Sequence, residues 1–112
     1  MPPEKSGPVA LQGTLELLVL HTLTPGSLHG YAIAQQIGKL SQDVLKVEQG
    51  SLYPALERLE RNGWVTSAWK DTPTGRVARY YTITKSGRKQ LGEKMDQYQR
   101  TTLAIARVLG QD

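Results

Sequence analysis

Residues 47–63 constrain the fold of this chain more than any other stretch. The leucines of this stretch recur at i, i+4 and i+7, which places them on one face of an α-helix: Leu52, Leu56 and Leu59. Asn62 and Gly63 follow, and both residue types tolerate the positive φ that ends a helix. The stretch therefore predicts one short amphipathic helix whose apolar side belongs to a core.

Pro54 limits where this helix can begin. We expect Ser51 to be the N-cap, because its hydroxyl can accept a hydrogen bond from a free backbone N–H of the first turn. Pro54 would then lie in the first turn, where its missing N–H costs nothing. An earlier start would make Pro54 break a hydrogen bond inside the helix.

The side of this helix away from the leucines is polar and basic, with Ser51, Tyr53, Pro54, Arg58 and Arg61. A helix of about three turns fits a DNA major groove, and its N-terminal residues would meet the base edges first. The alternative is an ordinary amphipathic surface helix, which is the commoner case when the helix is taken alone.

The positive charge of the chain is concentrated directly after this helix. The net charge is +4. Residues 1–45 carry two basic and three acidic residues, a net charge of −1. Residues 70–89 carry six basic residues against Asp71 alone, a net charge of +5. A short basic segment is typical of a surface that binds a polyanion, although it also fits a solvated loop.

Length and composition exclude several classes of protein. A chain of 112 residues predicts one domain with a modest core. The sequence has no apolar run long enough to span a bilayer and no hydrophobic signal core at its start, so we expect a cytoplasmic protein. With no cysteine it has neither disulfide nor thiolate metal site, and His21 and His29 lack a ligand spacing. We therefore expect no metal and no cofactor.

The other elements complete a recognisable order. Residues 11–23 predict a leucine-rich first helix, and residues 29–40 predict a second helix with four residues inward: Ile33, Ala34, Ile37 and Leu40. Residues 43–47 predict a brief strand or an extended link. Residues 64–70 and 76–83 predict two strands around a turn at 71–75, with Tyr81 and Ile83 toward the core. Three helices followed by a basic hairpin is the order of a winged helix-turn-helix.

Thr84 is the expected N-cap of a final helix that runs to about Leu109. Its seam residues recur at spacings of 4, 3, 4, 3 and 4: Leu91, Met95, Tyr98, Thr102, Ile105 and Leu109. A helix of about 25 residues spans nearly 40 Å, more than so small a domain covers by itself. We expect a second copy to cover this stripe, with part of the helix folded back on the first helix.

The fold class is therefore α+β and mostly helical, a winged helix-turn-helix with a long C-terminal dimerisation helix. We expect three divisions: a flexible N-terminal tail at 1–10, a DNA-binding domain at 11–83 and a dimerisation helix at 84–112.

Five motifs resemble the PadR family of bacterial transcription regulators, in the branch with a single C-terminal helix. They lie at residues 12–15, 28–31, 48–56, 59–64 and 79–87. The combination of Gly-Ser-Leu-Tyr-Pro with Arg-Tyr-Tyr-Thr-Ile-Thr is specific, whereas a winged helix in general is not. The resemblance runs from about residue 11 to the end of the chain.

The resemblance implies a homodimer that binds a palindromic operator in double-stranded DNA and represses a neighbouring gene. The expected DNA-binding residues lie at the start of the second helix, on the third helix and in the wing: Tyr31, Ser51, Tyr53, Pro54, Arg58, Lys70, Arg76 and Arg79. The expected dimer interface adds Leu15 of the first helix to the seam of the last.

The resemblance also implies that a small hydrophobic or aromatic effector could bind between the subunits and release the DNA. The candidate pocket consists of Leu15, Val19, Met95 and Tyr98. The alternative is that Met95 and Tyr98 only fill the dimer interface.

Two other functions have different sequence support. A winged helix can be a protein–protein interaction module without specific DNA binding, with the last helix as its docking element. Catalysis has little support, because the sequence lacks a thiol, a paired carboxylate with a histidine and a Gly-rich loop after a strand. We therefore expect that the protein is not an enzyme.

Overall fold

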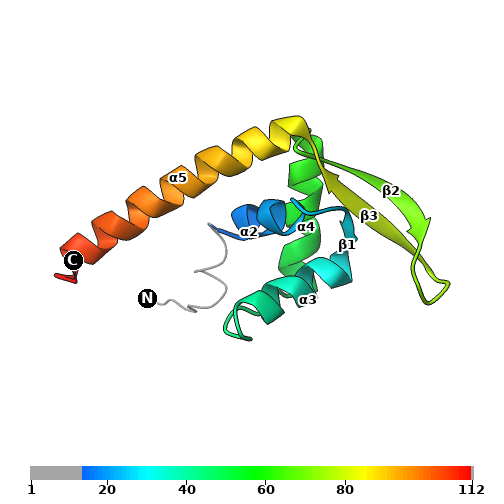
Figure 1. Cartoon of the computed structure of the whole chain (residues 1–112), viewed down its shortest axis with the longest axis horizontal. Helices are drawn as coiled ribbons and strands as arrows, with labels where there is room; N and C mark the ends of the chain where they lie inside the picture. The colour runs from blue at the N-terminus through cyan, green and yellow to red at the C-terminus, as the bar shows by residue number, and fades with distance from the viewer. Residues whose placement is uncertain (1–13, 112) are drawn as a thin grey trace.

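Helix α4 (Gln49–Arg61) lies at the centre of the described part of the chain, where it packs against α2, α3 and β2 (Figure 1). The structure, a computed structural model, describes residues 14–111. The other elements are α2 (Leu15–Thr22), β1 (Leu28–His29), α3 (Gly30–Leu40), β2 (Val65–Asp71), β3 (Val77–Ile83) and α5 (Lys85–Val108). The predicted tail at 1–10 and the start of the predicted first helix lie outside the described residues. In Figure 1, α5 and the β2–β3 hairpin extend from the packed helices in opposite directions.

The core forms around the apolar face of α4. Leu52, Leu56 and Leu59 are buried as predicted, and Ala55 is buried with them. They belong to one cluster with side chains of α2, α3 and the sheet, including Val19, Leu20, Ile33, Val65 and Tyr81. Full burial of a leucine side chain stabilises the fold by about 1.5–3 kcal/mol. The opposite side of α4 is left to solvent.

Helix α4 begins earlier than the sequence predicts. Its N-cap is Glu48, whose carbonyl accepts from the amides of Ser51 and Leu52 at 3.0 and 2.9 Å. The expectation that Ser51 is the N-cap was therefore wrong, and Pro54 lies inside the helix. Pro54 provides no amide for the Gly50 carbonyl. Gly50 is exposed at the start of the helix, so its carbonyl can be hydrated and the missing hydrogen bond costs little.

The end of α4 matches the prediction. Gly63 has a φ of 77°. Its amide donates to the Glu60 carbonyl at 3.0 Å, and the amide of Trp64 donates to the Leu59 carbonyl at 2.9 Å. These two hydrogen bonds form a Schellman motif, which satisfies carbonyls that the helix end leaves free.

The sheet has three antiparallel strands in the order β1-β3-β2. The β2–β3 hairpin was predicted, and Tyr81 and Ile83 are buried as expected. Strand β1 was not, because two residues give no periodic signal; Leu28 and His29 pair with Tyr81 and Tyr80.

Near the end of α3 one expectation was wrong, and the structure decides between two alternatives for the segment that follows. Leu40 was expected inward but is 64% exposed, because it is the last residue of α3 and the chain turns away directly after it. Gln42 and Asp43 have φ values of 55° and 65° in that turn. Residues 43–47 form no strand, so they are the link that the sequence left as an alternative.

The start of α5 is joined to the end of α4. Thr84 is the N-cap as predicted, and its hydroxyl accepts from the Gly87 amide at 2.9 Å. The same hydroxyl donates to the Gly63 carbonyl at 2.8 Å, and the Thr84 amide donates to the Trp64 carbonyl at 3.0 Å. Gly87 is buried so close to Trp64 that a Cβ would collide with the Trp64 carbonyl oxygen. We call Gly63, Trp64, Thr84 and Gly87 the α4–α5 joint.

Beyond this joint α5 leaves the body of the protein. Leu91 is buried against the core, but Met95, Tyr98, Ile105 and Leu109 are exposed along the 24-residue helix. Within residues 14–111 no helix is both long enough and apolar enough to cross a membrane.

We expect Gly87→Ala to lower the free energy of unfolding by about 1–3 kcal/mol, because the new methyl group displaces the Trp64 carbonyl from the α4–α5 joint. Gly92→Ala is the matched control, since a Cβ at Gly92 meets nothing within 4 Å and alanine favours the same helix. Urea unfolding followed by circular dichroism measures both. Equal stability of the two variants would contradict the close packing at Gly87.

Candidate nucleic-acid interface

The N-terminal half of α4 carries three of the predicted DNA-binding residues on its exposed side. Ser51, Tyr53 and Pro54 are exposed, opposite the buried leucines. The Tyr53 ring lies directly over Gly30, the first residue of α3, where a Cβ would come within 2.6 Å of the Tyr53 hydroxyl oxygen. Gly30 therefore allows the start of α3 to approach the exposed side of α4, which brings Tyr31 near this surface.

A row of aromatic residues continues from α3 to the wing. Tyr31 is 61% exposed and stacks on His29 with ring centroids 6.5 Å apart. His29 meets Tyr80 of β3 edge-on at 5.3 Å, and the Lys70 ammonium lies 5.8 Å from the centre of the Tyr80 ring. We call Tyr31, His29, Tyr80 and Lys70 the aromatic row. It links two predicted residues, Tyr31 and Lys70, through two that sequence reasoning missed.

His29 also begins α3. Its Nδ1 accepts from the Ala32 amide at 3.2 Å, so the hydrogen of a neutral ring is on Nε2. The sequence placed His29 at this helix start but gave no signal for its ring contacts, which depend on the pairing of β1 with β3.

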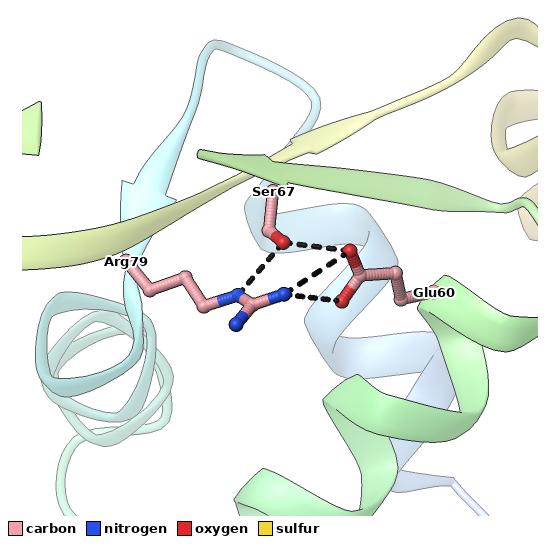
Figure 2. A network of polar contacts seen from close by, with 3 residues as sticks. All are labelled: Glu60, Ser67 and Arg79. Carbon is pink, nitrogen blue, oxygen red and sulfur yellow. Dashed lines mark hydrogen bonds and ion pairs between the residues drawn. The ribbon is translucent and has the colours of Figure 1, made fainter. Parts of the chain in front are cut away.

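Arg79 lies on the other face of the wing from Lys70. It pairs across the strands with Trp69, the neighbour of Lys70, and successive strand residues point to opposite faces. Its Nε donates to the Ser67 hydroxyl at 2.8 Å, and that hydroxyl donates to Glu60 at 2.7 Å (Figure 2). Its Nη2 lies 3.4 Å from a Glu60 carboxylate oxygen. Sequence reasoning missed Glu60 and Ser67, since their contacts join α4 to the sheet.

Arg58 lies on the same exposed side of α4 as Ser51 and Pro54, about 20° and 40° from them around the helix, but away from the wing. Its Nε lies 2.9 Å from the carboxylate of Glu16 in α2, and Lys94 of α5 lies 3.4 Å from the same carboxylate. At about 100° per residue, Arg58 and the wing-facing Glu60 are about 160° apart around the helix. A role of Arg58 at DNA stays a prediction. Arg76 is exposed in the hairpin turn, where its carbonyl accepts from the Thr72 amide at 2.6 Å.

The predicted dimer seam divides into a buried and an exposed part. Leu15 and Leu91 are buried in the core of their own chain. Met95, Tyr98, Thr102, Ile105 and Leu109 are exposed, and the Thr102 hydroxyl is satisfied by the Tyr98 carbonyl at 2.8 Å.

An open hollow of about 540 Å³ follows the outer half of α5, lined by Gln97, Arg100, Thr101, Ala104, Ile105, Val108 and Leu109. It does not involve the four residues predicted to bind an effector. Of these, Leu15 and Val19 are buried, whereas Met95 and Tyr98 are exposed. The effector pocket stays a prediction.

Comparison with known proteins decides the family. Residues 19–93 match the sequence profile of the transcriptional regulator PadR-like family, which covers more than half of the chain. A transcriptional regulator of Mycobacterium tuberculosis is 34% identical over 82 residues, which is 73% of each protein. The chain belongs to the PadR-like family. The resemblance found in the sequence is thereby confirmed.

Solved structures of PadR-like and other transcriptional regulators have the same fold. A transcriptional regulator from Clostridium thermocellum matches with a TM-score of 0.81 at 26% identity, over 88% of this chain and 96% of the other. A PadR-like transcriptional regulator from Bacillus cereus matches with a TM-score of 0.74 at 26% identity, over 90% of this chain and 96% of the other. The PadR winged helix with a long C-terminal helix is therefore confirmed as the fold.

Tyr81, a buried residue of strand β3 in the wing, has a different pKa in the folded and the unfolded chain. Burial raises the pKa of the Tyr81 phenol above its ordinary value of 10.0, and the nearby Arg79 guanidinium opposes this rise. Because the folded-state pKa is the higher one, the stabilisation is complete below pH 10.0 and is lost as the pH rises through the folded-state value.

We expect the free energy of unfolding of the wild type to fall more steeply above pH 10.0 than that of Tyr81→Phe, which has no phenol to ionise. Urea unfolding from neutral to alkaline pH measures both slopes. Tyr31→Phe is the control, since the Tyr31 side chain is exposed and lies outside the proposed dimer seam. If the free energy of unfolding fell equally steeply with pH in wild type and Tyr81→Phe, Tyr81 would not contribute to the loss of stability at alkaline pH.

Proposed function

We propose that this PadR-like regulator is a sequence-specific repressor that binds a palindromic operator as a homodimer. The observation that carries the proposal is the surface around α4, where Ser51, Tyr53 and Pro54 lie exposed beside the start of α3. Family membership supports DNA-binding transcription regulation itself. Repression and the palindrome are our own additions.

In the proposed complex the N-terminal half of α4 enters the major groove. Ser51, Tyr53 and Pro54 meet base edges there, and Tyr31 donates its hydroxyl to a phosphate. Lys70, Arg76 and Arg79 lie along the wing and contact phosphates. Phosphate contacts supply most of the affinity and its salt dependence, whereas base contacts supply the choice of sequence.

The homodimer is supported by the exposed seam of α5. Met95, Tyr98, Ile105 and Leu109 expose apolar surface that one copy of the chain leaves uncovered. A second copy with the same seam would cover it by two-fold symmetry, and two-fold symmetry in the protein matches a palindrome in the DNA.

An effector would act by changing this dimer. Met95 and Tyr98 are exposed on the seam, and we propose that a small hydrophobic or aromatic compound binds beside them between the subunits. Leu15 and Val19 would join the pocket only if α2 moved relative to α5, since both are buried. Such a compound changes DNA affinity only if it binds one subunit arrangement more tightly.

The function is tested by selecting bound duplexes from a random-sequence library with the purified protein. Enrichment of a palindromic sequence is the expected result. Recovery of unrelated duplexes would contradict sequence-specific binding and would favour a protein–protein interaction module, whose partner would be sought on α5.

We expect Arg79→Ala to weaken binding to the selected duplex and to a scrambled duplex by a similar factor. It should also make the dependence of affinity on salt shallower, because one phosphate contact is lost. Fluorescence anisotropy at several salt concentrations measures both effects. Arg100→Ala is the control, because this substitution removes the same charge from the outer half of α5, away from the proposed DNA-binding surface. An unchanged affinity and salt slope in Arg79→Ala would remove Arg79 from the interface.

We expect Ile105→Glu to convert the dimer into a monomer, because it places a carboxylate in the apolar seam. Light scattering measures the mass in solution. Arg100→Glu places the same group about 140° away around α5 and should leave the dimer intact. A dimer that survives Ile105→Glu would contradict the seam as its interface.

A further inference from the structure

The guanidinium group of Arg79 is held along one edge. Its Nε donates to the Ser67 hydroxyl at 2.8 Å, and its Nη2 lies 3.4 and 3.5 Å from the two carboxylate oxygens of Glu60. Ser67 in turn donates to Glu60 at 2.7 Å, so that the three side chains form a closed triangle (Figure 2). We call Glu60, Ser67 and Arg79 the Glu60 triangle.

The flat face of the same group is held as well. The central carbon of the guanidinium lies 5.7 Å from the centre of the Trp69 ring, its partner across the strands. The third nitrogen, Nη1, points away from both Ser67 and Glu60 in Figure 2. The side chain is 43% exposed. Among residues 14–111, Arg79 thus has bonded N–H donors only on its Nε and Nη2 side, which leaves Nη1 for a ligand.

The three members of the triangle come from three elements. Glu60 lies in the last turn of α4, Ser67 in β2 and Arg79 in β3. The triangle therefore fixes the charged group of the wing at a set distance from the helix that is proposed to enter the groove.

We propose that Glu60 is a positioning residue for DNA binding, which holds Arg79 so that Nη1 meets a phosphate while α4 lies in the groove. The inference rests on the proposed function. A free arginine side chain loses much rotamer entropy when it binds, and a pre-positioned one has already lost it. Glu60 itself touches no DNA in this arrangement and acts through Arg79.

Whether the loss of Glu60 weakens or strengthens DNA binding distinguishes a positioning role from an effect of its negative charge alone. Glu60 is an acidic group close to a surface that binds a polyanion. If it acted only by its charge, its removal would strengthen binding. If it positions Arg79, its removal weakens binding even though the net charge rises.

The test compares Glu60→Ala with Glu57→Ala in the full chain. Both variants remove one carboxylate from α4, and Glu57 is exposed one turn earlier. Fluorescence anisotropy with the duplex selected from the random library measures affinity. We expect Glu60→Ala to bind roughly 3–10-fold more weakly, about the effect of losing one ordinary hydrogen bond, because Arg79 itself remains, and Glu57→Ala to bind equally or more tightly. Thermal unfolding confirms that each variant is folded.

Ser67→Ala provides a second variant that leaves the net charge unchanged. It removes the acceptor of Arg79 Nε, and we expect it to weaken binding as well. In an Arg79→Ala background neither Glu60→Ala nor Ser67→Ala should weaken binding further, because the group that they position is gone. A purely structural effect of either substitution would persist in that background.

The outcomes distinguish the inference from the proposed function. If Arg79→Ala weakens binding but Glu60→Ala binds as tightly as wild type or more tightly, the positioning role is wrong and the proposed function stands. If the wild type shows no preference for any duplex, the proposed function fails and the inference fails with it.

Discussion

The burial of one side of α4 determines what the rest of the molecule can do. Leu52, Leu56 and Leu59 enter a core shared with α2, α3 and the sheet, so the helix cannot rotate without exposing them. Its other side is left exposed by the same packing. Hydrophobic burial therefore both stabilises this small domain and orients the surface that contains Ser51, Tyr53 and Pro54.

The wing has two chemically different faces because its side chains alternate. One face continues the aromatic row from Tyr31 to Lys70, and the other holds the Glu60 triangle beside Trp69. A basic segment in the sequence thus becomes two separate cationic groups in space. Each is held by neighbours that the sequence does not place next to it.

Much of the fold follows from local patterns. The leucine spacing predicts α4, Asn62 and Gly63 predict its end, and Thr84 predicts the start of α5. The start of α4 was predicted too late, because Pro54 is tolerated one and a half turns into the helix, where the Gly50 carbonyl that it leaves free is on the exposed side. Long-range pairing defeated local reasoning elsewhere: β1 forms only beside β3, and Glu16 pairs with Arg58, 42 residues away in the chain.

The candidate interface shows the same limit. Residue types and positions identified the exposed side of α4 and the basic wing. The partners of Arg79 come from α4 and β2, and His29 of β1 meets Tyr80 of β3, so no short segment contains these contacts. The pairing of an arginine with a carboxylate was therefore beyond the reach of composition or periodicity.

The α4–α5 joint has a mechanical consequence. Hydrogen bonds from Thr84 and the close packing of Gly87 tie the first turn of α5 to the last turn of α4. A helix of 24 residues is about 36 Å long, so a pivot of about 5° at this joint would displace its far end by about 3 Å. Any change of angle between α5 and the body of the protein would therefore occur about the α4–α5 joint. A small change of angle at the joint therefore moves the far end of α5 a long way, and a movement of the far end changes the angle at the joint only slightly.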